Sequence, residues 1–169
     1  ALEGIPNTPR YWLTGRYELL SKLDCFGVFQ VFWTLSCADL RWDANFASIL
    51  LQRGYSINVE VVVRDGQPDY EYQARKRDGE WKPLRQFIEE DVEVSFHELI
   101  RGNVLTATRY FQHRVQHFIR KIMMAESAPM PVKMYSYKTE FQARGAGHIH
   151  GVIWLDTHRL SKMVRAPDG

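Results

Sequence analysis

The segment TEFQARGAGHIHGVIWL (139–155) holds parts of two extended runs, VKMYSYKTEFQ (132–142) and HIHGVIWL (148–155), with a short link between them. Side chains of alternating character line both runs, which is typical of strands that are buried on one face. The link ARGAG (143–147) is far shorter than the crossover that parallel strands need. The segment therefore predicts two neighbouring antiparallel strands.

Alternation along the second strand assigns its two histidines to one face. His148 and His150 point away from the face that carries Ile149, because successive side chains of a strand point to opposite sides. If ARGAG is the whole connection, Gln142 pairs with His148 and Glu140 pairs with His150, with Cβ atoms roughly 5 Å apart. We therefore expect two imidazoles and two oxygen-bearing side chains on one patch, unless a bulge in the turn shifts the register.

Such a patch has the ligands of a metal site. Two imidazoles and a carboxylate or amide oxygen, with coordination positions left over, suit a divalent ion that acts as a Lewis acid. Imidazole alone suits zinc, whereas the oxygen ligands also suit manganese or magnesium bound to a phosphate. A His-x-His pair on a strand is also a common incidental feature, and the facing Glu140 and Gln142 favour the metal.

The remaining chain predicts an alternation of helices and strands. Residues 67–83 are polar and are interpreted as a hairpin or a long excursion. Together the patterns predict one α+β domain over residues 1–169, in which a central antiparallel sheet has helices on one face and its other face open. The other expected elements are helices at 7–27, 42–52 and 106–123 and strands at 29–39 and 56–66.

The helix expected over 106–123 has the clearest amphipathic pattern. Arg120 and Lys121 lie off its apolar stripe. Its HRVQH motif (113–117) has the histidine spacing of a metalloprotease helix, but Arg114 stands where the catalytic glutamate belongs, which excludes that class. The apolar stripe consists of Phe111, Val115, Phe118 and Ile122.

Composition limits the compartment and the partners. A formal net charge of +2 permits a nucleic-acid partner without requiring one. Cys25 and Cys37 have no metal or redox spacing and are expected to be reduced core residues, which favours the cytosol or nucleus. We expect no membrane segment and no signal peptide. The chain has no initial methionine and ends in RAPDG (165–169), so we expect it to be a piece of a longer protein.

Four blocks of the sequence, taken in order, resemble the replication initiator domain of Helitron transposons. That family belongs to the HUH endonucleases of rolling-circle replication, which are named for a His-hydrophobe-His motif. Gly147 departs from the resemblance, because these elements commonly have proline before the first histidine. The blocks are TPRYW (8–12), FWTLSCADLRW (32–42), HELIRGNVLTATRYFQHRVQHFIRKI (97–122) and YKTEFQARGAGHIHGVIWL (137–155).

The resemblance implies an HUH/RRM-like fold and a metal-dependent endonuclease and strand transferase that acts on single-stranded DNA. His148 and His150 would be metal ligands, Gln142 the third, and Glu140 the second choice, either as a ligand or as a group that orients His150. The metal, manganese or magnesium with zinc as a possibility, would polarise the scissile phosphate.

The resemblance also implies a tyrosine nucleophile and a 5′-phosphotyrosine intermediate. In Helitron initiators a tyrosine pair lies downstream of the His-x-His strand, yet no tyrosine follows Leu155. We therefore expect the nucleophile to lie beyond this chain, with Tyr11 and Tyr17 on the first helix as the candidates inside it.

The expected partners are single-stranded DNA and a helicase domain in the same polypeptide. The expected location is the nucleus for a eukaryotic element and otherwise the cytoplasm. Cationic side chains would contact phosphates and a tryptophan would stack on an unpaired base. The candidates for DNA contact are Lys138, Arg144, Trp154, Arg120 and Lys121.

Two other functions stay open. The first is a catalytically inactive module that binds single-stranded DNA and uses its histidines structurally. The second is a histidine phosphoesterase that needs no metal, although such enzymes usually have a second histidine motif or a longer histidine run.

Overall fold

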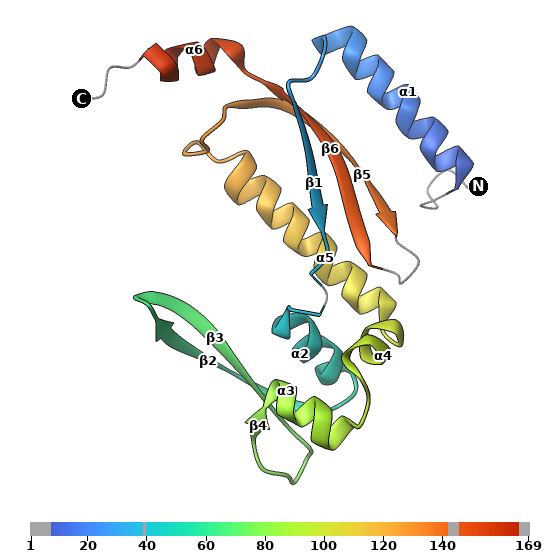
Figure 1. The fold of residues 1–169 in the computed structure, drawn as a ribbon, viewed down its shortest axis with the longest axis vertical. Coiled ribbons are helices and arrows are strands. Elements are labelled where there is room, and N and C mark those ends of the chain that lie inside the picture. Colours follow the sequence, from blue (N-terminus) through green and yellow to red (C-terminus); the bar gives the residue numbers. More distant parts are fainter. Residues whose placement is uncertain (1–7, 39, 142–145, 166–169) are drawn as a thin grey trace. The chain divides into compact units, whose positions relative to one another are not determined.

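A computed structural model describes residues 8–38, 40–141 and 146–165 (Figure 1). The chain divides into two compact units, which are described separately. The first unit comprises Ala1–Cys37 with Gln112–Gly169, and the second comprises Ala38–Phe111. The expected α+β class is confirmed, but each unit has its own three-stranded antiparallel sheet where the sequence predicts one central sheet. The expectation of one domain over residues 1–169 stays a prediction.

The first unit contains the predicted antiparallel pair and adds the first strand beside it, in the order β1-β6-β5. The central strand, β6, has both neighbours and is buried along most of its length. The elements of this unit are α1 (Pro9–Phe26), β1 (Val31–Ser36), the second half of α5 (Val104–Phe118), η2 (Ile119–Met123), β5 (Val132–Phe141), β6 (Gly147–Leu155) and α6 (Thr157–Arg165).

The first helix, Pro9–Phe26, lies within the predicted range 7–27 and is capped at both ends. The side-chain oxygen of Thr8 accepts a hydrogen bond from the backbone N–H of Tyr11 at 3.2 Å, and Pro9 occupies the first helical turn. At the other end Gly27 has a φ of 75°, and its N–H donates to the carbonyl of Leu23 at 2.8 Å. These caps fix the position of α1 along the sequence.

One face of the β1-β6-β5 sheet packs against α5. Trp33 on β1 and Tyr137 on β5 both pair with Gly151 on β6, so the three residues lie in one row across this face. The indole of Trp33 lies 6.1 Å from the ring of Phe118 on α5, measured between ring centroids. Ile149, on the same face, is 1% exposed. The predicted core face of the strands is therefore the face that α5 covers.

The opposite face is partly covered by α1, whereas the sequence predicts that it is open. Lys22 of α1 donates a hydrogen bond to Ser136 of β5 at 2.9 Å, and Glu18 of α1 forms an ion pair with Lys138 of β5 at 2.9 Å. These contacts join residues that lie more than a hundred positions apart, so no local pattern could reveal them.

The buried stripe of α5 differs from the predicted one in its last turn. Val115 is buried as expected, but Ile122 is 54% exposed, and Met123 is buried in its place. The backbone bonds from i to i+5 in this turn, as the hydrogen bond from Met124 N–H to the carbonyl of Ile119 shows. The half-buried Phe118 is likewise replaced by the buried Ile119, so the buried positions recur every four residues from Val115 to Met123.

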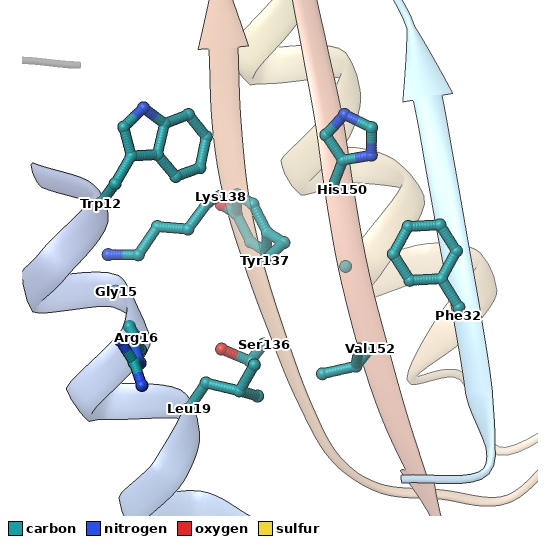
Figure 2. A pocket seen from close by; sticks show the side chains of 11 residues that line it. Trp12, Gly15, Arg16, Leu19, Phe32, Ser136, Tyr137, Lys138, His150 and Val152 are labelled. Atoms are coloured by element: carbon teal, nitrogen blue, oxygen red, sulfur yellow. The ribbon is translucent and has the colours of Figure 1, made fainter. Parts of the chain in front are cut away.

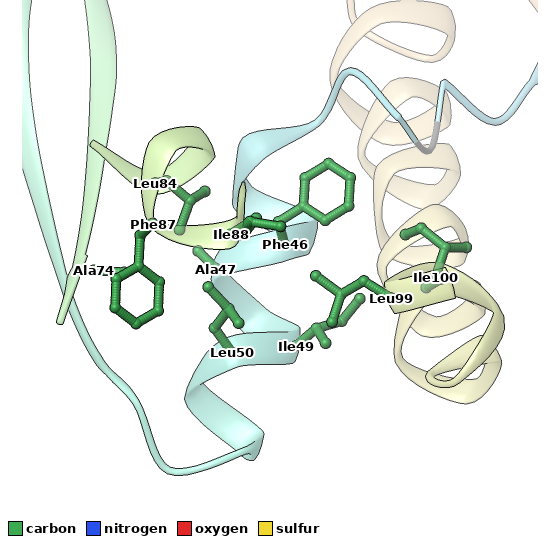
Figure 3. Packing of buried hydrophobic residues seen from close by; sticks show 11 residues of the cluster. Phe46, Ala47, Ile49, Leu50, Ala74, Leu84, Phe87, Ile88, Leu99 and Ile100 are labelled. Carbon is green, nitrogen blue, oxygen red and sulfur yellow. The ribbon is translucent and has the colours of Figure 1, made fainter. Parts of the chain in front are cut away.

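The second unit is built around a hairpin and short helices, and its apolar core is shown in Figure 3. Asp65 and Gly66, both with positive φ, form the tight turn of the hairpin, as the Asp-Gly pair predicts. The helices between residues 84 and 101 are absent from the sequence prediction. The elements are α2 (Asp43–Gln52), β2 (Ser56–Arg64), β3 (Gln67–Arg75), β4 (Lys82–Pro83), α3 (Leu84–Phe87), η1 (Ile88–Val92) and α4 (Phe96–Arg101), followed by the start of α5.

Two further expectations concern cysteines and membranes. Cys37 is buried as expected, but Cys25 is exposed at the end of α1. Within the described ranges, no helix combines the length and apolar character that a membrane crossing requires.

Candidate functional site

The face that lies toward α1 carries the histidines. Because β6 lies between β1 and β5, one row across the sheet consists of Ser36, His148 and Glu140. The next row includes His150 and Lys138. All five side chains share one face, since paired residues of antiparallel strands point to the same side.

Close contacts connect the first of these rows to the second. Ser36 Oγ lies 2.8 Å from His148 Nδ1, and the centroids of the His148 and His150 rings are 4.5 Å apart. Glu140 Oε2 lies 3.3 Å from His150 Nε2, an ion pair when the imidazole is protonated. The His150 and Glu140 side chains are 41% and 46% exposed, so the cluster can be reached from solvent.

The predicted register is wrong, but the predicted face is right. Glu140 pairs with His148 and Lys138 pairs with His150, whereas the sequence predicts Gln142 with His148 and Glu140 with His150. The connection runs one residue earlier than assumed, because β5 ends at Phe141 and β6 begins at Gly147. The partner of each histidine moves by two residues, and a shift of two keeps every side chain on its face.

The expected ligands are only partly described. Glu140, His148 and His150 lie together, and Glu140 reaches His150 across the diagonal between the two rows. Gln142, the expected third ligand, lies outside the described residues. Among the residues that are described, no three His, Cys, Asp or Glu side chains are arranged ready for a metal ion. The carboxylate and imidazoles would have to adjust their rotamers to share one ion, and their partial exposure allows this.

A cavity adjoins His150 between α1 and the sheet (Figure 2). It has a volume of about 310 Å³. Trp12 on the α1 side and Phe32 on the β1 side flank it, with His150 of β6 between them in the view. The rings of Phe32 and His150 are 27° from parallel, with centroids 6.0 Å apart. The remaining lining comes from Gly15, Arg16, Leu19, Ser136, Tyr137, Lys138, Gly151 and Val152.

The expected DNA contacts are distributed over both faces. Lys138 lines the cavity, and its ammonium lies 4.9 Å from the centre of the Tyr11 ring. Arg120 and Lys121 are exposed on η2, which continues the helix on the opposite face of the sheet, so the structure does not bring them to the histidines. Arg144 lies outside the described residues.

Trp154 is on the histidine face as alternation predicts, but it cannot offer its ring to a base. It is 1% exposed, and its indole N–H donates to the carbonyl of Gly27 at 2.7 Å. Phe26 and Phe29 pack against it with ring centroids 6.2 Å away. The expectation that Trp154 stacks on DNA is therefore wrong, because the end of α1 and the following link bury this end of the face.

The two candidate nucleophiles differ in their surroundings. The hydroxyl of Tyr11 donates to the carbonyl of Thr139 at 3.2 Å and accepts from the N–H of Thr139 at 3.3 Å. Tyr17 is 63% exposed on α1. On the opposite face, burial first and then the neighbouring Tyr135 and Tyr11 raise the pKa of the Tyr137 phenol, which makes Tyr137 a poor nucleophile.

Sequence reasoning missed three residues of this region, namely Ser36, Phe32 and Trp12. Alternation along the first strand already places Phe32 and Ser36 on the side opposite Trp33. The missing information was that β1 pairs with β6, which brings this side next to the histidines.

The chain matches a known protein family over most of its length. The family described as Helitron helicase-like domain at N-terminus matches residues 2–153. No curated protein and no solved structure matches the chain.

Proposed function

This chain belongs to the family of Helitron helicase-like domains at the N-terminus, and on that basis we propose that it is a metal-dependent endonuclease and strand transferase for single-stranded DNA. The observation that carries the proposal is the cluster of Glu140, His148 and His150 on a sheet face beside a cavity with aromatic and cationic walls. The proposed setting is rolling-circle transposition, with a helicase domain in the same polypeptide.

The donors of the cluster fit a divalent cation. His148 and His150 would supply imidazole nitrogens and Glu140 a carboxylate oxygen, a set that suits manganese or magnesium and also zinc. When bound there, the ion would supply Lewis-acid polarisation of a phosphate oxygen.

The residues around the cluster have supporting roles in this proposal. Ser36 holds the His148 ring at Nδ1, which leaves Nε2 as the nitrogen available to a ligand. Lys138, the partner of His150 across the strands, supplies a positive charge for a DNA phosphate. Each is a positioning or binding group, and neither transfers the phosphoryl group.

The attacking tyrosine is proposed to come from a segment downstream of the His-x-His strand. Tyr11 already uses its hydroxyl twice on the backbone of Thr139, so attack by Tyr11 would require it to leave the edge of the sheet. Tyr17 is reachable from solvent, but it is not among the residues that line the cavity beside His150.

A second candidate function is a DNA-binding module without catalysis. The observation that favours it is that both histidines have partners without any metal, since Ser36 bonds to His148 and Glu140 pairs with His150. In that case the cluster only ties the three strands together.

Metal titration distinguishes the two functions. We expect Mn²⁺ to bind the wild type and to raise its melting temperature, with about 2.7 kcal/mol of stabilisation at a free concentration one hundred times Kd. The double variant His148→Ala/His150→Ala should lose both effects. The control is His97→Ala/His158→Ala, which removes two exposed histidines elsewhere. Equal Mn²⁺ affinity in the two double variants would rule out the metal site.

A further inference from the structure

The cavity beside His150 is suited to one particular occupant. We propose that it holds a single unpaired nucleobase of the DNA strand whose phosphate lies at the histidine pair. This inference rests on the proposed function, because it assumes that single-stranded DNA reaches Glu140, His148 and His150. It assigns to Trp12 and Phe32 the stacking role that buried Trp154 cannot have.

The aromatic walls are the first support. Trp12 is 39% exposed and Phe32 is 59% exposed, although both border a cavity. Figure 2 shows them on opposite sides of it, one from α1 and one from β1, with the side chain of Val152 below His150. Two partly exposed rings that flank an apolar floor provide π-faces for a base, and every base offers a π-face in return.

The charge of the walls is the second support. Lys138, Arg16 and His150 all line the cavity, and Glu18 is the carboxylate that pairs with Lys138. A nucleotide carries its base and its phosphate on opposite sides of the sugar. A base between the rings would therefore place the adjoining phosphates near these basic side chains, whereas a purely apolar ligand would make no use of them.

The size of the cavity sets a limit of one occupant. Its volume of about 310 Å³ is at the lower end of the range of small-molecule sites, roughly 300–1,000 Å³. It can admit one base, but it cannot admit a stack of bases or a duplex.

A glycine in the middle of α1 is a third, independent support. Gly15 lines the cavity at an interior helix position, where glycine is unfavourable relative to alanine. A Cβ at this position would lie 2.6 Å from Lys138 Cε, so the lysine passes directly over the glycine. Because glycine has no side chain, it leaves space on α1 for Lys138 to extend across the helix to Glu18.

The test uses oligonucleotides with one abasic site moved along the strand. Binding of the whole chain is measured by fluorescence anisotropy without divalent metal and again with Mn²⁺. For the wild type we expect one position at which loss of the base weakens binding about 5- to 150-fold, as expected for one aromatic-stacked base. In Trp12→Ala and in Phe32→Ala this position should become as tolerant of base loss as the others.

Two further variants sharpen the result. Trp81→Ala is the matched control, because Trp81 is 40% exposed and belongs to the other unit; it should keep the sensitive position. Gly15→Leu should abolish the sensitivity while leaving both aromatic walls in place, because its side chain fills the cavity. Thermal melting of each variant checks that it is folded, and the Gly15→Leu arm keeps the test decisive if Trp12→Ala unfolds.

The outcomes separate the base pocket from the proposed function. If the wild type binds DNA but no position is sensitive, or if Trp12→Ala weakens intact and abasic strands equally, the pocket proposal fails and the metal site stands. If the wild type binds no single-stranded DNA, the proposed function itself fails, and the pocket proposal fails with it.

Discussion

Replacing Gly151 by alanine should disturb the sheet that carries the histidines. A Cβ on Gly151 would lie 2.3 Å from Trp33 Nε1 and 2.4 Å from its Cε2, whereas carbon atoms in contact prefer about 3.5–4.0 Å. The indole has little space to move, because the rings of Phe118 and Tyr137 both lie 6.1 Å from it between centroids. Overpacking of this kind costs about 1–3 kcal/mol.

The expected destabilisation can be read from thermal unfolding. For a chain of this size a loss of 1 kcal/mol lowers the melting temperature by about 2–4 °C, so Gly151→Ala should lower it by roughly 2–12 °C. Gly79→Ala is the control, because a Cβ there meets only ordinary contacts at 3.5 Å or more. The double variant Gly151→Ala/Trp33→Leu should recover part of the loss relative to the sum of the single variants. An effect of Gly151→Ala no larger than that of Gly79→Ala would refute the close packing of Trp33 on β6.

Three other perturbations test separate parts of the structure. Tyr11→Phe removes the hydroxyl that bonds twice to the backbone of Thr139, so we expect about 1 kcal/mol less stability in denaturant unfolding. In a chain extended to include a downstream tyrosine pair, the same variant should leave DNA nicking unchanged. Lost nicking would instead make Tyr11 the nucleophile. Ser36→Ala removes the partner of His148 Nδ1 and should weaken Mn²⁺ binding about 10- to 100-fold by calorimetry, while unchanged affinity would mean that Ser36 does not orient the ring. The ammonium of Lys82 lowers the pKa of Asp91 through a hydrogen bond. The stability that Asp91 adds is therefore present above its unfolded pKa, about 3.9, and is lost as the pH falls through the lower folded pKa. Asp91→Asn should flatten the acid side of the stability–pH curve, and a curve of unchanged slope would contradict the role of this pair.

The face of each strand was predictable from the sequence, but the pairing was not. Alternation assigns Glu140, His148 and His150 to one side whatever the exact turn, because the side-chain period is two. The register depends on where the chain leaves β5 and enters β6, and the amino-acid sequence of residues 142–146 does not identify one turn type. A connection that begins one residue earlier was enough to give His148 the partner expected for His150.

Burial along the histidine face was the other unpredictable feature. Alternation treats His148 and Trp154 alike, yet Trp154 is 1% exposed while His148 is half-buried. The difference arises from Gly27, Phe26 and the end of α1, which close over one end of the face. Which helix covers which part of a sheet depends on contacts distant in sequence, and no local periodicity encodes them.

The position of α1 connects the stability of the sheet to the candidate site. In the described part of the chain β5 is an edge strand, whose outward backbone groups need partners or protection. Tyr11 satisfies both backbone groups of Thr139 at this edge, and one turn later Gly15 lets Lys138 cross to Glu18. The same turns of α1 form the wall of the cavity beside His150. Among the described residues, no hydrogen bond or ion pair joins Glu140, His148 or His150 to α1. A change that releases α1 from β5 should therefore widen the cavity and weaken the proposed base contact before it affects these three residues.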